Sequence, residues 1–357
     1  MRIPFLVYFT CAILMNAVAQ NDNPANRYLD AYKQYVDASC PLEKDSIKHF
    51  VYFARDREQI RNHSLLTSPR IEGAQVMYAW RQLEPQRGEY DFSIVTEDYS
   101  YLLSHGKKLF IQFQDVTFST AYKAVPEYLL TEEFGGGCLQ SYNDNGVAEG
   151  WVAKRWNPEV QQRFALLMQA LGKEFDGKIE GVNLQESAVG NFKEKDPTFT
   201  PMRYAECLKE NMLALKKAFP HSTTMQYANF MPGEWLPWED HGYLRSLYQY
   251  GQEIGVGLGG PDLLFQRKGQ LNHLIAMMHE TTYTVPLGIA IQDGNYIGKT
   301  GADEAYNEHV DQGTNGRRNR VPLLHAFAKD FLRVEYMFWV DQAPYFLEDL
   351  LPCLTQP

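Results

Sequence analysis

The chain has 357 residues and a formal net charge of −10, from 34 basic and 44 acidic side chains. This acidic balance, without clusters of basic residues, excludes a surface built to neutralise phosphates, so nucleic acid is not an expected partner. The length suits one barrel domain with insertions and does not require a second compact domain.

The N-terminal 19 residues have the pattern of a secretory signal peptide. Arg2 precedes an apolar run from Ile3 to Met15, and Ala17-Val18-Ala19 supplies a small-residue cleavage site. No later segment approaches the ~20 apolar residues that a membrane span needs. We therefore expect residues 1–19 to be removed, and residues 20–357 to form a soluble catalytic domain that is secreted or periplasmic.

Eight apolar runs follow along the chain, and stretches with helical spacing separate most of them. The clearest helical stripe begins at Val160 and ends at Phe175. Alternating strands and helices predict a parallel sheet, and eight of them at this length predict a closed (β/α)8 barrel. The expected strands are 49–54, 74–80, 108–113, 179–184, 224–228, 254–258, 285–291 and 334–339.

Two connections are too long to be simple links. About 65 residues separate the third and fourth runs, far more than an ordinary loop. A second insertion, Lys299 to Arg320, is rich in Gly, Asn, Asp and Arg. Both are expected to form walls of a cleft at the barrel mouth.

Four cysteines remain after the signal peptide: Cys40, Cys138, Cys207 and Cys353. Their wide spacing excludes a compact zinc motif, and an exported protein permits up to two disulfides among three pairings. Cys40 with Cys353 would join the two ends of the chain, and Cys138 with Cys207 would fix the long third loop. Unpaired buried thiols are the alternative.

Glu186 is the principal candidate for chemistry, because it ends the fourth strand and is followed by a loop. The carboxyl ends of barrel strands open onto the active-site face. Cleavage of a glycosidic bond uses two carboxyl groups. Asp293, at the end of the seventh strand across the mouth, is the expected second group. A helix-capping role is the alternative for any single acid in such a place.

Several passages together resemble the clan of retaining (β/α)8-barrel glycoside hydrolases that includes β-galactosidases, cellulases and β-mannanases. The resemblance covers most of the mature chain. Its strongest element is the passage from Trp80 to Phe92, with Glu84-Pro85, Gly88 and Tyr90-Asp91-Phe92. Further matches are 106–112, 125–129 and Trp156-Asn157-Pro158. It implies an acid/base at Glu186 and a ligand-facing tryptophan at Trp339.

The chain departs from this family at two positions. Gln185 stands where the resemblance implies an asparagine that binds the sugar 2-hydroxyl, and Asp293 stands in place of a glutamate nucleophile. The shorter side chain of Asp293 withdraws its oxygens by roughly 1 Å, a displacement that costs ~10²-fold in a near-attack geometry. We expect retention of anomeric configuration if the backbone at Gly294 compensates. Inversion or loss of activity are the alternatives.

Other polar and aromatic residues at strand ends are candidates for substrate binding, although polar residues there also satisfy loop backbone groups. Trp235 and Trp238 lie in the loop after the fifth strand, where they would stack on sugar rings or simply pack together. The remaining candidates are Arg81, Gln112, Gln114, Gln185, Asn229, Asp262, Trp339 and Asp341.

Cofactor and metal motifs are weak. The run Gly255 to Gly260 superficially resembles a dinucleotide fingerprint, but Pro261 interrupts the required helix start. His279-Glu280 lacks the second histidine of the zinc-protease motif. We expect no cofactor and no metal. The sequence thus predicts an exported glycoside hydrolase that acts on a carbohydrate of the β-galactoside or β-glucan kind, with a catalytically impaired carbohydrate-binding barrel as the alternative; its oligomeric state is not predicted.

Overall fold

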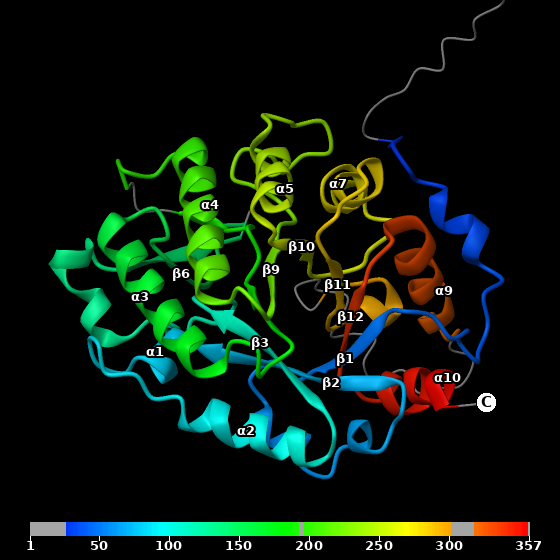
Figure 1. Cartoon of the computed structure of the whole chain (residues 1–357). Coiled ribbons are helices and arrows are strands. Elements are labelled where there is room, and N and C mark those ends of the chain that lie inside the picture. Colours follow the sequence, from blue (N-terminus) through cyan, green and yellow to red (C-terminus); the bar gives the residue numbers. More distant parts are fainter. Residues whose placement is uncertain (1–25, 144, 193–195, 301–317, 356–357) are drawn as a thin grey trace, which may run out of the picture.

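The computed structural model describes residues 26–143, 145–192, 196–300 and 318–355. Its centre is a single closed barrel of eight parallel strands with helices between them, as predicted (Figure 1). The barrel order is β1-β12-β11-β10-β9-β7-β3-β2. The strands are β1 (Lys48–Tyr52), β2 (Ile71–Ala79), β3 (Lys108–Gln114), β7 (Gly181–Leu184), β9 (Thr223–Tyr227), β10 (Gly257–Gly260), β11 (Leu287–Ile291) and β12 (Tyr336–Val340). The predicted signal peptide and most of the predicted insertion 299–320 lie outside the described residues.

All eight predicted strands are present, and the sixth is displaced along the chain. Ile254 was expected to begin it, but this residue ends α5 (Tyr243–Ile254). Gly255 then adopts a left-handed conformation with φ 77° and stops the helix. The strand therefore begins only at Gly257.

Helices cover the outside of the barrel. The predicted apolar stripe lies on α3 (Pro158–Phe175) and is buried. The Asn157 side chain caps the start of this helix, because its oxygen accepts from the backbone N–H groups of Glu159 and Val160, both at 3.0 Å. The Thr200 hydroxyl caps α4 (Pro201–Ala218) by accepting from the Arg203 backbone N–H, and Pro201 occupies the first turn. The remaining helices include three very short ones. The helices are α1 (Trp80–Leu83), α2 (Ser93–Ser104), α3 (Pro158–Phe175), α4 (Pro201–Ala218), α5, α6 (Lys268–Asn272), α7 (Leu274–Glu280), α9 (Val321–Ala326) and α10 (Leu351–Thr355).

The inside of the barrel changes from aromatic to polar. Phe50, Phe110 and Phe338 contact one another, with ring centroids 5.0 to 5.8 Å apart. Closer to the strand ends, Gln75 donates through one amide nitrogen to Asn183 Oδ1 at 2.8 Å and to the Tyr227 hydroxyl at 3.2 Å. Amides and hydroxyls therefore form the floor beneath the mouth.

The glycines of β10 are required by close approach of the next strand. A Cβ at Gly259 would lie 1.8 Å from the carbonyl oxygen of Gly288 in β11, a distance that no side chain tolerates. The glycine run that resembles a nucleotide motif thus has a packing role in the barrel wall.

The motif that begins at Trp80 is held together by one buried carboxylate. Glu84 is fully buried and accepts from the Trp80 indole N–H and the Gly88 backbone N–H, both at 2.9 Å. It also forms an ion pair with Arg163 of α3. The motif therefore fixes the loop after β2 against the neighbouring helix.

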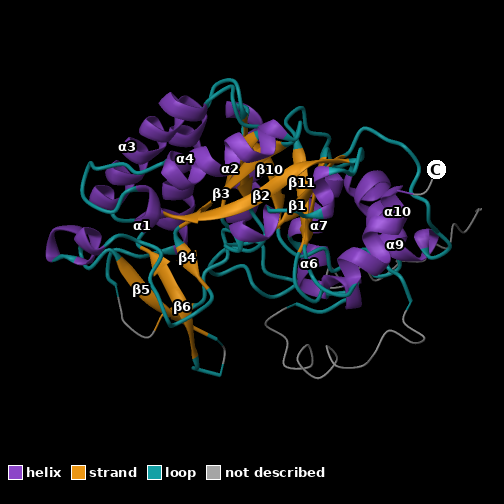
Figure 2. Ribbon diagram, turned by 90° about the horizontal axis from the view of Figure 1, so that it is seen from below, coloured by secondary structure: helices purple, strands orange, loops and turns teal. Residues whose placement is uncertain are grey.

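Three strands in the long connection after β3 and one in the connection after β7 form a small antiparallel sheet, which we call the wall sheet. Its order is β4 (Val116–Thr117), β6 (Ala148–Ala153), β5 (Cys138–Tyr142) and β8 (Asn191–Phe192). Figure 2 shows that this sheet lies to one side of the barrel strands. The two ends of the connection after β3 lie side by side, because Val116 pairs with Val152 and the Ala153 N–H donates to the Asp115 carbonyl at 3.0 Å.

One of the two proposed disulfides is present. Cys40 and Cys353 are joined across a sequence separation of 313 residues, which ties the segment before β1 to α10. The second proposed pair, Cys138 with Cys207, is not joined, and both of these side chains are buried. Among the residues that the structure describes, no helix combines the length and apolar character needed to cross a membrane.

Candidate active site at the barrel mouth

Glu186 lies two residues beyond β7, at the carboxyl end of the barrel, as predicted. Asn229 follows the neighbouring strand β9, and its amide nitrogen donates to Glu186 Oε2 at 2.6 Å. The Asn229 side chain is itself fixed, since its oxygen accepts from the Ala188 N–H at 3.3 Å. Two strand ends predicted separately therefore form one hydrogen-bonded pair.

The backbone of Glu186 is held from behind by a buried arginine. Arg155 Nη1 donates to the Glu186 carbonyl at 2.9 Å and to the Tyr204 hydroxyl at 2.8 Å. The other edge of this guanidinium binds both carboxylate oxygens of Asp115, at 2.7 and 2.6 Å. Sequence reasoning missed Arg155, Asp115 and Tyr204, because no local motif links them.

The pKa of the Glu186 carboxyl is raised to about 7, mainly by burial and in smaller part by the negative charge of Asp262. The hydrogen bond from Asn229 and the charge of Arg155 act in the opposite direction. A carboxyl group with this pKa holds a proton for much of the time at neutral pH, as a general acid must.

Asp262, after β10, is the carboxylate that acts on Glu186. It has a left-handed backbone with φ 64°, unusual outside glycine. Asn295 donates to Asp262 Oδ1 at 2.9 Å and accepts from the Gln292 N–H at 2.9 Å. The buried Asn295 thus links the loops after β10 and β11, and it is another residue that the sequence did not indicate.

Asp293 lies on the same face but is exposed. Partial burial of its carboxyl, together with the charge of Asp56, raises its pKa. Burial raises the pKa of the Tyr52 phenol at the end of β1, and the charges of Asp293, Asp262 and Glu186 add to this effect.

The structure places Gln185 differently from the role that the family resemblance implies. Its side chain is buried, and its amide oxygen accepts from the backbone N–H groups of Asp115 and Val116, at 2.9 and 2.8 Å. Gln185 thus joins two loops instead of facing the mouth.

Trp339 also lies away from the mouth. It is 1% exposed, and its indole N–H donates to His49 Nδ1 at 3.0 Å. The tryptophan predicted to contact the ligand therefore has a structural role. Asp341, by contrast, is at the rim, with Oδ1 3.5 Å from His63 Nε2.

The remaining candidates line the mouth or its edge. Gln112 and Gln114 are buried, and each has an amide oxygen without a hydrogen-bond partner in the described part of the chain. Arg81 is exposed. Trp235 and Trp238, in the loop after β9, are 39% and 63% exposed, which leaves aromatic surface for a ligand.

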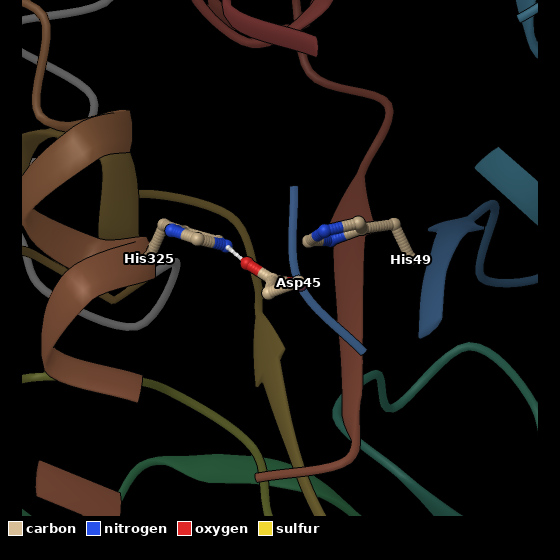
Figure 3. A group of neighbouring side chains, drawn as sticks. All are labelled: Asp45, His49 and His325. Atoms are coloured by element: carbon tan, nitrogen blue, oxygen red, sulfur yellow. Dashed lines mark ion pairs between the residues drawn. The ribbon is translucent and has the colours of Figure 1, made fainter. Parts of the chain in front are cut away.

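Asp45, His49 and His325 form a group of residue types that can bind metals. They lie before β1, in β1 and in α9. Their ligand atoms lie within 4.8 Å of one another, with Asp45 between the two rings (Figure 3). His325 Nε2 is 2.8 Å from Asp45 Oδ2. Because His49 Nδ1 accepts from Trp339, the proton of the neutral ring is on Nε2, which then has no lone pair for a metal. The group therefore fits a polar network better than a metal site.

Comparison with known proteins finds similarity in structure but none in sequence. No protein-family model matches the chain, and no curated protein matches it. The chain is similar to endo-glycoceramidase II from Rhodococcus sp. (11% identity, 86% of this chain and 76% of that chain, TM-score 0.47). It is also similar to a psychrophilic glycoside hydrolase family 10 endo-β-1,4-xylanase (13%, 88% and 89%, 0.44). A third is a family 39 glycoside hydrolase from Bacteroides cellulosilyticus WH2 (12%, 89% and 57%, 0.47).

Proposed function

We propose that this chain hydrolyses glycosidic bonds, with Glu186 as the general acid. The observation that carries the proposal is the pKa of about 7 at Glu186, on a carboxyl that ends a barrel strand at the mouth. Leaving-group oxygens of sugars need a proton in the transition state, and a carboxyl group with a raised pKa supplies it near neutrality. The adjacent Asn229 amide is positioned to hold this group in one orientation.

Asp262 is the favoured second carboxyl group. Its negative charge raises the pKa of Glu186, and Asn295 holds its carboxylate in place. Asp293, the position expected from the sequence, is the alternative. A base at either site would activate water and invert the anomeric carbon, and a nucleophile would retain it. Asp262→Asn and Asp293→Asn, with NMR of the first-formed anomer, separate these roles.

The substrate is a carbohydrate, and the mature chain acts outside the cytoplasm. Exposed indoles at Trp235 and Trp238 offer flat faces to sugar rings. The signal-peptide pattern at residues 1–19 and the disulfide between Cys40 and Cys353 support export to an oxidising compartment. Neutral β-galactosides and β-glucans are the first substrates to assay.

Glu186→Gln is the direct test. The change keeps the shape and the Asn229 contact but removes the proton donor, so turnover is expected to fall ~10²–10⁴-fold on substrates with poor leaving groups. Activated aryl glycosides need little protonation, so they should lose less. Circular dichroism confirms folding of the variant. If Glu186→Gln turned over an unactivated oligosaccharide as fast as the wild-type protein does, the proposal would be refuted.

A carbohydrate-binding barrel without turnover is the second candidate. It is favoured by the exposed Asp293 where the resemblance implies a glutamate nucleophile. The wild-type protein would then bind oligosaccharides in calorimetry, yet release no reducing sugar during long incubation. Product release that depends on Glu186 excludes this candidate.

A further inference from the structure

Two arginines share one aromatic ring at the barrel mouth. Tyr122, in the connection after β3, has the guanidinium carbon of Arg55 at 4.1 Å from its ring centroid and that of Arg81 at 5.3 Å. Arg55 comes three residues after β1, and Arg81 comes two residues after β2. These adjacent strands therefore bring two positive charges to the same ring.

Neither charge is neutralised within the described part of the chain. In the ranges that the structure describes, the side chains of Arg55 and Arg81 form no ion pair and no hydrogen bond, and both residues are exposed. Arg61 is a useful contrast: it lies 4.0 Å from the Tyr101 ring centroid and also pairs with Glu97 at 2.8 Å. A guanidinium stacked on a ring keeps its N–H edge available for a planar anion.

This stack is connected to the acid through a short series of contacts. Gln114 donates to the Tyr122 hydroxyl at 2.9 Å. Gln185, the residue before Glu186, accepts from the N–H of Asp115 at 2.9 Å. The stack thus lies on the β1–β2–β3 side of the mouth, where β3 pairs directly with β7.

Gln114 supplies a second observation that points to a ligand. The residue is 4% exposed, and its amide oxygen has no partner among the described residues. A buried acceptor left without a donor destabilises the folded protein. A ligand hydroxyl beside the two arginines would satisfy it.

We infer that Arg55, Arg81, Tyr122 and Gln114 form a subsite for a negatively charged sugar unit, a uronate or a sulfate ester, in the substrate of the proposed hydrolase. The guanidinium edges bind the anion, and Gln114 accepts from a neighbouring hydroxyl. Glu186, Asp262 and Asp293 repel an anion from their own part of the mouth. The charged unit therefore binds in one orientation. The inference rests on the proposed function for the identity of the ligand as a sugar.

The test compares sugars that differ only in charge. Calorimetry with Glu186→Gln protein measures binding of trigalacturonate and of its methyl ester, and of a sulfated galactan oligosaccharide and its desulfated form. We expect one acidic sugar to bind at least about tenfold more tightly than its neutral form, as charge-assisted hydrogen bonds predict. The pair that shows this difference identifies a carboxylate or a sulfate. Higher salt should weaken that difference.

Variants assign the difference to the stack. Arg55→Gln and Arg81→Gln should each weaken binding of the acidic sugar about tenfold and leave the neutral sugar unchanged. Arg61→Gln, from an arginine stacked on a tyrosine but paired with an acid, is the matched control and should change neither. If Glu186→Gln lowers the melting temperature, the wild-type ratio of kcat/KM for acidic over neutral sugar replaces the affinity ratio.

The outcomes separate this inference from the proposed function. Equal affinity for acidic and neutral sugars, no binding of any of the four, or acidic binding indifferent to both arginines overturns the subsite. Hydrolysis of neutral sugars that depends on Glu186 leaves the proposed function standing in that case. Arginine-dependent binding of an acidic sugar, with no cleavage by wild type, upholds the subsite and refutes the hydrolase.

Discussion

A general acid works only while it holds its proton, so the activity should follow the ionisation of Glu186. Burial places that pKa at about 7, and kcat/KM is therefore expected to fall as pH rises through this value. Asp262→Asn removes a negative charge that raises the pKa, so the alkaline limb should move to lower pH. Asn229→Ala removes a hydrogen bond that favours the ionised form, so the limb should move to higher pH.

The measurement is the pH profile of residual activity, with carboxyl titration followed by NMR for variants that are too slow. Opposite shifts in the two variants would confirm that both neighbours set this pKa. A limb that stays in place in both would show that another group controls the alkaline side.

At the residue scale, sequence reasoning found those site residues that strand ends alone determine. Glu186 and Asn229 were predicted because each follows an apolar strand. Gln185 was assigned the wrong direction, because its partners are two backbone N–H groups in a distant loop. Arg155 was missed for a similar reason: its contacts with Asp115 and the Glu186 carbonyl exist only after folding.

At the element scale, eight strands were predictable because apolar runs alternate with amphipathic helices, a pattern that few folds accommodate. The glycine-rich β10 was displaced in the prediction, since its strand character comes from close packing against β11 and not from apolar side chains. The wall sheet was predicted only as a long loop. Its strands are short, and β8 reaches it from a different connection, so no local periodicity reveals it.

The network of Asp45, His49 and His325 joins the segment before β1 to β1 and α9, and it should make stability depend on pH. Burial and the charge of His325 lower the pKa of His49 from 6.5 to about 3, although Asp45 opposes this and Arg70 assists it. Burial works to raise the pKa of Asp45, but the hydrogen bonds from His325 and the Ile47 N–H lower it from 3.8 to about 2.

Both groups take up a proton more readily when the chain unfolds. The contribution of His49 to stability is therefore complete above pH 6.5 and declines as pH falls toward 3, and that of Asp45 is complete above pH 3.8 and is lost as pH falls through about 2. The free energy of unfolding should fall by up to about 1.4 kcal/mol per pH unit for each proton below pH 6.5. Urea unfolding at pH 7 and 4.5 measures this slope. His49→Gln should reduce it, exposed His105→Gln should not, and equal slopes in all three proteins would contradict the prediction.

At the scale of the whole molecule, the disulfide between Cys40 and Cys353 holds the two ends of the barrel chain together. It closes a loop of 313 residues, so its reduction increases the conformational entropy of the unfolded chain and lowers stability. We expect a loss of about 3–5 kcal/mol and a lower melting temperature in reductant. Cys40→Ser protein should melt at that lower temperature with or without reductant. A wild-type melting temperature indifferent to reductant would show that the bond contributes little.

The connection from Asp115 to Ala153 leaves the barrel and returns to it at adjoining residues, since the Ala153 N–H donates to the Asp115 carbonyl. Its length and sequence can therefore change without altering the barrel strands, provided that β5 still pairs with β8 from the connection after β7. Tyr122 belongs to this connection, whereas Arg55 and Arg81 directly follow the barrel strands β1 and β2. Evolution can therefore change how the two charges are presented by altering one surface loop, while the strand ends that carry Glu186 and Asp262 are inherited unchanged.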